Sequence, residues 1–414
     1  MLEKMKSAWR IPELRKKIIY TFGMLLLYRM LCCIPVPGVN IAAVSEAVKS
    51  FSVLDFMNMM TGGSFQNMTI MAMGITPYIN ASIILQLLTV AIPTLEKLAK
   101  EGPEGRKKIT EWTRYLTVAL AFIQAVGLVF AMRANSYGGI WYLVIGVSMA
   151  AGTSLAMWIG ERITENGIGN GISLLIMAGI VSNMFNWSRQ AVVGLIDGTV
   201  GIIAVLVVVL AFLVMIVAIT YVDMGERRIP VQYAKRMVGR KMYGGQSTHI
   251  PMKLNSTGVM PLIFGFAILQ FPATVFAFFP TSGINLWWQG FQSSVWYQVV
   301  LAVLIIAFTY FYTGITFNPA DISKNMQQNG GIIPGIRQGR ATTDYLARVS
   351  SRLTLFSALF LAVLATIPTI ITRLFGVSTP FAASSVLIAV SVGIETIRQI
   401  EAQMVMRHHK GFLG

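Results

Sequence analysis

The stretch Met73–Tyr115, MGITPYINASIILQLLTVAIPTLEKLAKEGPEGRKKITEWTRY, contains the two patterns on which the fold depends. Its first part belongs to an apolar run from Met68 to Ile92, which is long enough to cross a bilayer, since a spanning helix needs about 20 residues. Its second part is polar and carries six Lys and Arg residues. An apolar run followed by a basic loop is typical of a spanning helix that ends on the cytoplasmic side.

The composition of the whole chain is that of a membrane protein. Hydrophobic residues make up 55% of the 414 residues and charged residues only 12%, and the mean hydropathy is +0.65. The 33 Lys and Arg exceed the 17 Asp and Glu, and in a membrane protein this excess marks cytoplasmic loops rather than nucleic-acid binding. Cys32 and Cys33 are adjacent and the three histidines lie in or beside polar segments, so neither a disulfide framework nor a metal site is expected.

Ten apolar stretches are long enough to span a bilayer, and together they predict an all-α integral membrane protein. They are Ile18–Ile34, Met68–Ile92, Thr113–Met132, Ile140–Gly160, Gly171–Trp187, Val200–Tyr221, Gly258–Phe279, Val295–Phe317, Leu353–Arg373 and Pro380–Arg398.

The distribution of basic residues predicts the orientation of these spans. An even number of spans places both termini on one side. With the N-terminus in the cytoplasm, 28 of the 33 Lys and Arg lie on the cytoplasmic side. We therefore predict cytoplasmic N- and C-termini and two halves, residues 1–198 with spans one to five and residues 199–414 with spans six to ten. Five spans per half are compatible with an inverted structural repeat, although no sequence repeat is visible.

One apolar segment is too short to cross the membrane. Val53–Thr61, VLDFMNMMT, precedes the second span on the external side, and Gly62 and Gly63 end it. Segments of this length are more often re-entrant or interfacial.

Two predicted cytoplasmic loops are long and basic. In Gly225–Asn255, alternating residues on both sides of a YGG turn predict a hairpin that projects from the membrane. Asn318–Arg352 contains NGGIIPGIRQGRATTDY, in which glycine and proline predict an ordered, turn-rich loop. Basic loops of this kind serve topology and lipid contact, and their length and patterning also favour a docking surface.

The predicted spans contain few charged side chains. Arg29 is the one charge well inside a span, where snorkelling or an intramolecular partner explains it. Isoleucine pairs four residues apart share a helical face in two spans, and packing alone accounts for them. Amide and hydroxyl groups in the spans imply interhelical hydrogen bonds or a water-accessible seam. The string GIGNGI from Gly167 does not match a nucleotide-binding pattern and predicts a tight turn before the fifth span.

Several stretches resemble the bacterial SecY family. They include the quoted Met73–Tyr115, IPVPG, ITENGIGNGIS, ERRIPVQYAKRMVGRKMYGGQSTHIPMKLN, GVMPLIF, QFPAT, FNPADIS and PGIRQGR, and they run in family order from Ile34 to Arg340. One departure is Gln338, where family members commonly have proline after the arginine.

The resemblance implies two halves that form a clamshell around a central hourglass pore. Its motifs place an apolar pore ring at Ile79, Ile83, Ile172, Ile176, Ile263 and Ile388. A short re-entrant plug helix at residues 53–63 corresponds to Val53, Leu54, Phe56, Met57, Met60, Gly62 and Gly63. A lateral gate between spans two and seven, with neighbours three and eight, involves Gln86, Thr89, Gln124 and Asn170.

The resemblance also implies partners. The SecA ATPase or a ribosome would dock on the loops 225–255 and 318–352, through Arg227, Arg228, Arg240, Lys241, Arg337 and Arg340. The small membrane subunits SecE and SecG would complete a heterotrimer, and signal sequences, nascent chains and membrane lipids would contact the gate. No cofactor is implied, and the location would be the plasma membrane.

These expectations describe the central, non-enzymatic subunit of a channel that moves unfolded secretory proteins across the membrane and releases spanning segments into lipid. The main alternative is a ten-span secondary transporter of a small solute, which predicts a carboxylate or substrate cage near the bilayer midplane. An intramembrane enzyme would need a nucleophile–base pair or a metal site, for which the cysteines and histidines are unsuited.

Overall fold

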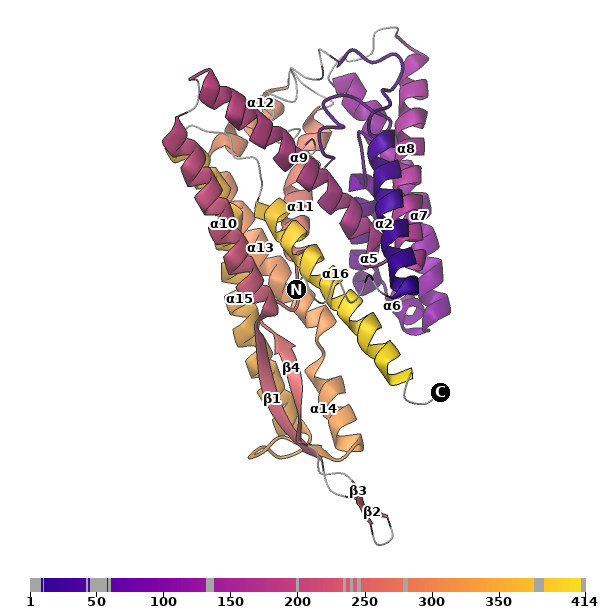
Figure 1. The fold of residues 1–414 in the computed structure, drawn as a ribbon, viewed down its shortest axis with the longest axis vertical. Helices are drawn as coiled ribbons and strands as arrows, with labels where there is room; N and C mark the ends of the chain where they lie inside the picture. Colours follow the sequence, from indigo (N-terminus) through magenta and orange to yellow (C-terminus); the bar gives the residue numbers. More distant parts are fainter. Residues whose placement is uncertain are drawn as a thin grey trace. The chain divides into compact units, whose positions relative to one another are not determined.

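The computed structural model describes residues 9, 11–41, 44, 58, 61–131, 138–198, 201–233, 236–238, 241–243, 247–277, 282–375 and 383–410 (Figure 1). The chain forms two compact units. Unit 1 comprises Met1–Leu206, Ala267–Ser293 and Val377–Gly414, and unit 2 comprises Val207–Phe266 and Ser294–Gly376. The predicted division into halves at residue 198 remains a prediction.

Helices make up most of both units. Unit 1 contains α2 (Pro12–Leu31), α5 (Thr76–Ala91), α6 (Pro93–Lys100), α7 (Pro103–Ala131), α8 (Trp141–Asn166), α9 (Gly171–Ile196), α12 (Gly283–Ser293) and α16 (Ala383–Lys410). Unit 2 contains α13 (Val295–Thr316), α14 (Pro319–Gln328), α15 (Arg340–Phe375) and the strands β1 (Glu226–Tyr233), β2 (Arg236–Val238), β3 (Lys241–Tyr243), β4 (Ser247–Lys253) and β5 (Gly331–Ile332). Helices α10 (Ile202–Met224) and α11 (Met260–Ala277) each contribute residues to both units.

Each of the ten predicted spans overlaps a helix, although their ends differ. Within the described residues, six helices are long and apolar enough to cross a membrane, namely α7, α8, α9, α10, α13 with α14, and α15. The bent pair α5 and α6 gives a seventh if it is counted as one span. The remaining predicted spans correspond to α2, α11 and α16. The architecture is that of a mostly helical, multi-pass membrane protein.

The end of the second predicted span is set by a proline. Ile92 is extended, with φ −109° and ψ 115°, as expected for a residue that precedes proline. Pro93 then begins α6, because a helix tolerates proline in its first turn. The axes of α5 and α6 therefore differ by 108°.

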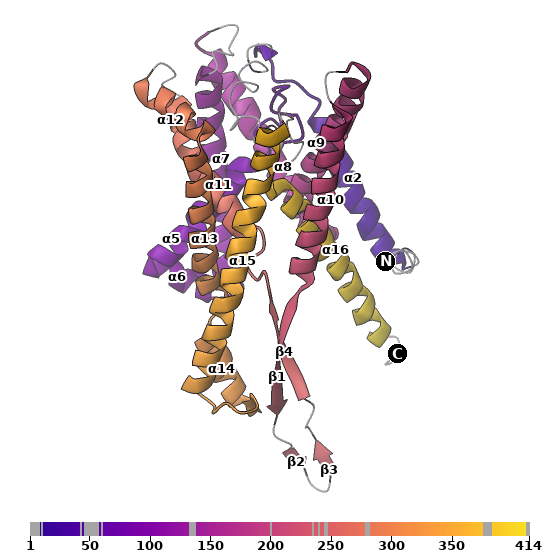
Figure 2. The same ribbon diagram turned by 90° about the vertical axis from the view of Figure 1, so that its left-hand side faces the viewer.

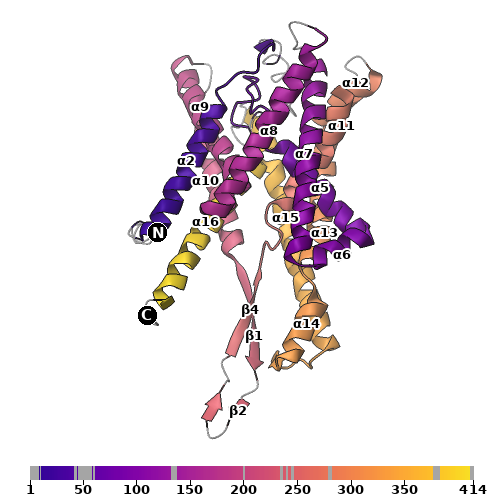
Figure 3. The ribbon, with the colours of Figure 1, turned by 90° about the vertical axis from the view of Figure 1, so that its right-hand side faces the viewer.

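In unit 1, α7 and α8 pack side by side (Figure 3), and residues 61–75 pack against both of them. We call residues 61–75 the cap segment. Its Phe65, Met68 and Ala72 are fully buried against α7 and α8. Gly152 of α8 allows this close packing, since a Cβ there would lie 2.0 Å from the Ile70 carbonyl oxygen.

In unit 2, the predicted hairpin is confirmed. Strand β1 pairs antiparallel with β4, from Glu226 opposite Lys253 to Gln232 opposite Ser247. The second basic loop contributes β5, which pairs with the other edge of β1 in the order β4-β1-β5. Strands from both of the predicted loops therefore form one three-stranded sheet, of which Figure 1 labels β1 and β4, while β2 and β3 of the first loop form a separate two-stranded sheet.

These loops share a hydrophobic core, which we call the loop core. Its buried members come from β1, β4, α14, the segment after β5 and the first turns of α15, and α13 and α15 continue away from it side by side (Figure 2). They are Ile229, Val231, Met252, Met326, Ile333 and Leu346. Only part of the second loop is turn-rich, because α14 and the start of α15 lie within residues 318–352.

Candidate functional site

Two of the predicted pore-ring residues line one pocket. Ile79 of α5 and Ile176 of α9 are joined there by Thr61 of the cap segment and Tyr28 of α2. The other lining residues are Ile75, Thr76 and Leu175. The lining is therefore mostly apolar, and the hydroxyl groups in it belong to Tyr28, Thr61 and Thr76.

The remaining ring residues occupy separate positions. Ile83 is buried one turn after Ile79 on α5, and Ile172 is half-buried one turn before Ile176 on α9. Ile388 is buried on α16, which packs against α9. Ile263 of α11 is half-buried and belongs to unit 2. The structure thus brings Ile79 and Ile176 together directly, and the closed ring of six remains a prediction.

The predicted plug is described only at its end. Val53, Leu54, Phe56, Met57 and Met60 lie outside the described residues. Gly62 and Gly63 have φ of +69° and +85°, which favours glycine, and the Gly63 amide donates to the Asn58 carbonyl oxygen over 2.9 Å. Glycine at these positions allows the tight turn with which the segment ends.

The end of the plug segment is bonded to α9. The Asn183 side-chain amide donates to the Asn58 carbonyl oxygen over 3.2 Å. Thr61 donates to the same oxygen over 3.2 Å and accepts from the Phe65 amide over 3.3 Å. The sequence places Asn58 and Thr61 in the predicted plug segment but does not predict their bonds or the contact with Asn183, because no spacing in the sequence relates residues 125 positions apart.

The predicted gate residues have different environments. Gln86 is exposed on α5, and Gln124 is half-buried on α7. The Thr89 hydroxyl donates to the Leu85 carbonyl oxygen of its own helix over 2.7 Å, so part of its polarity is satisfied locally. Asn170 caps α9, since its side-chain oxygen accepts from the amides of Ile172 and Ser173 over 3.1 Å and 3.3 Å. Their role in a gate remains a prediction.

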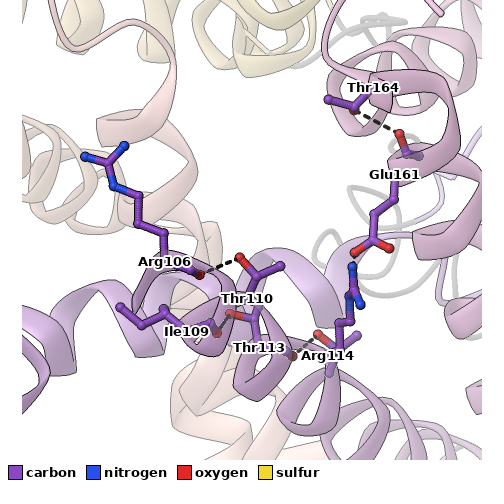
Figure 4. A network of polar contacts seen from close by, with 9 residues as sticks. Arg106, Ile109, Thr110, Thr113, Arg114, Glu161 and Thr164 are labelled. Atoms are coloured by element: carbon purple, nitrogen blue, oxygen red, sulfur yellow. Dashed lines mark hydrogen bonds and ion pairs between the residues drawn. The ribbon is translucent and has the colours of Figure 1, made fainter. Parts of the chain in front are cut away.

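One ion pair connects α7 with α8 (Figure 4). The Arg114 Nε donates to Glu161 Oε1 over 2.8 Å, and the hydroxyls of Thr110 and Thr113 on the same helix donate to the carbonyl oxygens of Arg106 and Ile109. In the sequence, Arg114 is one of the six basic residues assigned to the loop after the second predicted span. No sequence pattern predicts its ion pair with Glu161. Among the described residues, no group of three or more His, Cys, Asp or Glu is placed to hold a metal ion.

The predicted docking residues lie on the sheet and the turn before α15. Arg227 and Arg228 are exposed on β1, and Arg337 and Arg340 are exposed around the start of α15. Lys241 begins β3, and Arg240 lies outside the described residues.

The turn that presents Arg337 is held on both sides. The Thr342 hydroxyl donates to the Arg337 carbonyl oxygen over 2.8 Å, and the Ser323 hydroxyl of α14 donates to the Gly339 carbonyl oxygen over 2.9 Å. Gln338, which departs from the family pattern, donates through Nε2 to the Gly331 carbonyl oxygen of β5 over 3.1 Å. The glutamine thus ties the turn to the sheet while Arg337 stays exposed.

Comparison with known proteins decides the family. The family model described as SecY matches residues 69–397. The chain belongs to the SecY family. It is 43% identical over 441 residues to the protein translocase subunit SecY of Streptomyces scabiei and 41% identical over 427 residues to that of Aquifex aeolicus, covering all of this chain and of each relative.

A solved structure gives the same fold. It is a SecY protein whose plug domain is described as stabilising the closed state of the translocation channel and maintaining a membrane seal. The similarity has a TM-score of 0.69 at 21% identity and covers 94% of this chain and 92% of the other. Membership of the SecY family confirms the prediction of a multi-pass membrane subunit of a protein-conducting channel.

Proposed function

We propose that the chain is the central subunit of the channel that moves unfolded secretory proteins across the membrane and releases spanning segments into lipid. The observation that carries the proposal is the pocket in which Ile79, Ile176 and Thr61 meet. A narrow apolar constriction excludes ions because water leaves it, while it yields to a passing chain. In this role Ile79, Ile83, Ile172, Ile176, Ile263 and Ile388 form the ring.

The segment 53–63 is the plug in this proposal. Its described end is bonded to α9 through Asn58 and Asn183, and its Thr61 lines the same pocket as Ile79 and Ile176. A segment in this place blocks the space next to the constriction at rest. It leaves when a chain passes.

Gln86, Thr89, Gln124 and Asn170 belong to the lateral gate in this proposal. A passing segment rich in Leu, Ile and Phe gains a few tenths of a kcal/mol per residue on moving into lipid, whereas one central Lys or Asp costs about 2.5 to 3.5 kcal/mol. The gate therefore sorts segments by partition, without chemistry of its own.

The loop core supports a docking role for the two cytoplasmic loops. It gives them a shared, buried interior, so Arg227, Arg228, Arg337 and Arg340 belong to one folded surface. Arg240 and Lys241 are assigned to the same docking role from their place in the sequence of the first loop. We assign this surface to the SecA ATPase or the ribosome, and SecE and SecG to the same complex. We place both termini in the cytoplasm, because 28 of the 33 basic residues then face that side, and we assign the chain to the plasma membrane from its membership of the SecY family.

The experiment is crosslinking of a secretory chain stalled during translocation. Cysteines at Ile79 and Ile263 are expected to crosslink to the stalled chain, and the Ile84→Cys variant, on the exposed side of α5, serves as the matched control. Crosslinks that are equally strong at positions 79 and 84, or absent at position 79, would refute the assignment of the pore.

A further inference from the structure

Arg29 is a charged residue inside α2. Only one of the two terminal nitrogens of its guanidinium has a hydrogen-bond acceptor among the described residues. Its Nη2 donates to the hydroxyl oxygen of Ser182 on α9. Its Nη1 is buried and has no hydrogen-bond acceptor within the described part of the chain. A charged donor that is buried without an acceptor has lost its hydrogen bonds to water, and no hydrogen bond to the protein replaces them.

The plug segment covers this nitrogen. A Cβ on Gly62 would lie 2.5 Å from Arg29 Nη1 and 3.0 Å from both the Cα and the carbonyl oxygen of Gly179. Gly62 therefore fits closely between the guanidinium of α2 and the backbone of α9. Two opposing effects therefore act on the plug segment. The hydrogen bond between Asn183 and Asn58 holds the segment against α9, whereas the burial of Arg29 Nη1 disfavours this position.

We propose that Arg29 sets how readily the plug segment leaves its seat, and that its half-satisfied guanidinium favours release. When Gly62 moves away, water reaches Nη1 and the charge regains a hydrogen bond. The residue thus acts on the plug equilibrium and not on the passing chain. This inference rests on the proposed function, in which residues 53–63 are the plug.

The test measures how often the segment leaves. Thr61 is 2% exposed, so an engineered cysteine there reacts with a membrane-impermeant maleimide only when the segment moves away, and the labelling rate follows the open fraction. The full channel complex in membrane vesicles carries Thr61→Cys with Cys32 and Cys33 replaced by serine. Arg29→Met is compared with this parent because it keeps an unbranched side chain and removes the charge.

Arg29→Met is expected to slow labelling about tenfold, equivalent to about 1.4 kcal/mol. Ser182→Ala removes the acceptor of Nη2 and is expected to speed labelling by a similar factor of about ten. Arg29→Lys retains the charge and is expected to stay close to the parent. Opposite effects of Arg29→Met and Ser182→Ala are the signature, because a residue that simply holds the segment would give faster labelling in both variants.

Faster or unchanged labelling in Arg29→Met would overturn the inference. If that variant does not accumulate in the membrane, Arg29→Gln takes its place, and unchanged or slower labelling in Ser182→Ala overturns the inference independently. The resting ion conductance of a channel that lacks residues 53–63 separates the two proposals. No increase there refutes the plug itself, whereas an increase combined with unaltered labelling in Arg29→Met refutes only the role of Arg29.

Discussion

Leu346 provides a direct test of the loop core. It lies on the second turn of α15, is fully buried, and packs with Ile229 and Val231 of β1 and Ile333 after β5. Leu346→Ala removes three carbon atoms from the place where the two loops meet. The exposed arginines of the docking surface keep their identity in this variant.

The expected cost follows from the burial. Replacing a fully buried leucine by alanine costs about 2.7 to 5.0 kcal/mol, through lost transfer energy and the cavity left behind. A factor of ten in an equilibrium corresponds to about 1.4 kcal/mol, so the loops are expected to open at least about 100 times more often. The spanning part of α15 is unaltered, and insertion into the membrane is therefore expected to be normal.

Hydrogen exchange measures this opening. The β1 amides that pair with β4 exchange in proportion to local opening, and their rates are expected to rise by at least about 100-fold in Leu346→Ala. Leu355→Ala is the matched control, because Leu355 lies on the same helix but is 49% exposed. Exchange in β1 that is unchanged in Leu346→Ala, or equally fast in the control, would refute a shared loop core.

Three further variants test other parts of the proposed function. Arg337→Glu is expected to abolish ATP-driven transport of a preprotein into vesicles with normal insertion, whereas Arg348→Glu, an equally exposed reversal on α15, is expected to retain transport. Ile83→Ser with Ile176→Ser is expected to raise the resting ion conductance, and an unchanged conductance would contradict the ring. Gly152→Ala places a Cβ 2.0 Å from a carbonyl oxygen of the cap segment, so membranes are expected to contain less folded channel, as gel filtration in detergent would show.

The positions of the spanning helices could be predicted, but their ends could not. Hydropathy identifies only the part of a helix that lies in lipid, so the third predicted span began at Thr113 whereas α7 begins at Pro103. The charged turns between these residues are good helix formers and continue the same helix in water. For the same reason α15 begins at Arg340, 13 residues before the predicted start of its span.

The polar residues of the spans show why the sequence alone did not distinguish interhelical hydrogen bonds from a water-accessible seam. A threonine in a helix can donate to the carbonyl oxygen four residues earlier, and Thr89, Thr309 and Thr313 all do so. This bond needs no neighbouring helix and no water. Polarity in a span therefore does not by itself indicate a seam, and only the placement of the helices separates the two explanations.

The docking surface depends on a contact that no local pattern contains. The hairpin of β1 and β4 could be predicted because alternation and a turn lie within 31 residues of sequence. Strand β5 has only two residues, Gly331 and Ile332, and pairs with Gln232 and Tyr233 about 100 positions earlier, so it has no period to recognise. Its place is set by burial, because Ile333 directly after it enters the loop core. The turn with Arg337 follows four residues later, and its orientation therefore depends on a core residue rather than on the glycines and proline from which the loop was predicted.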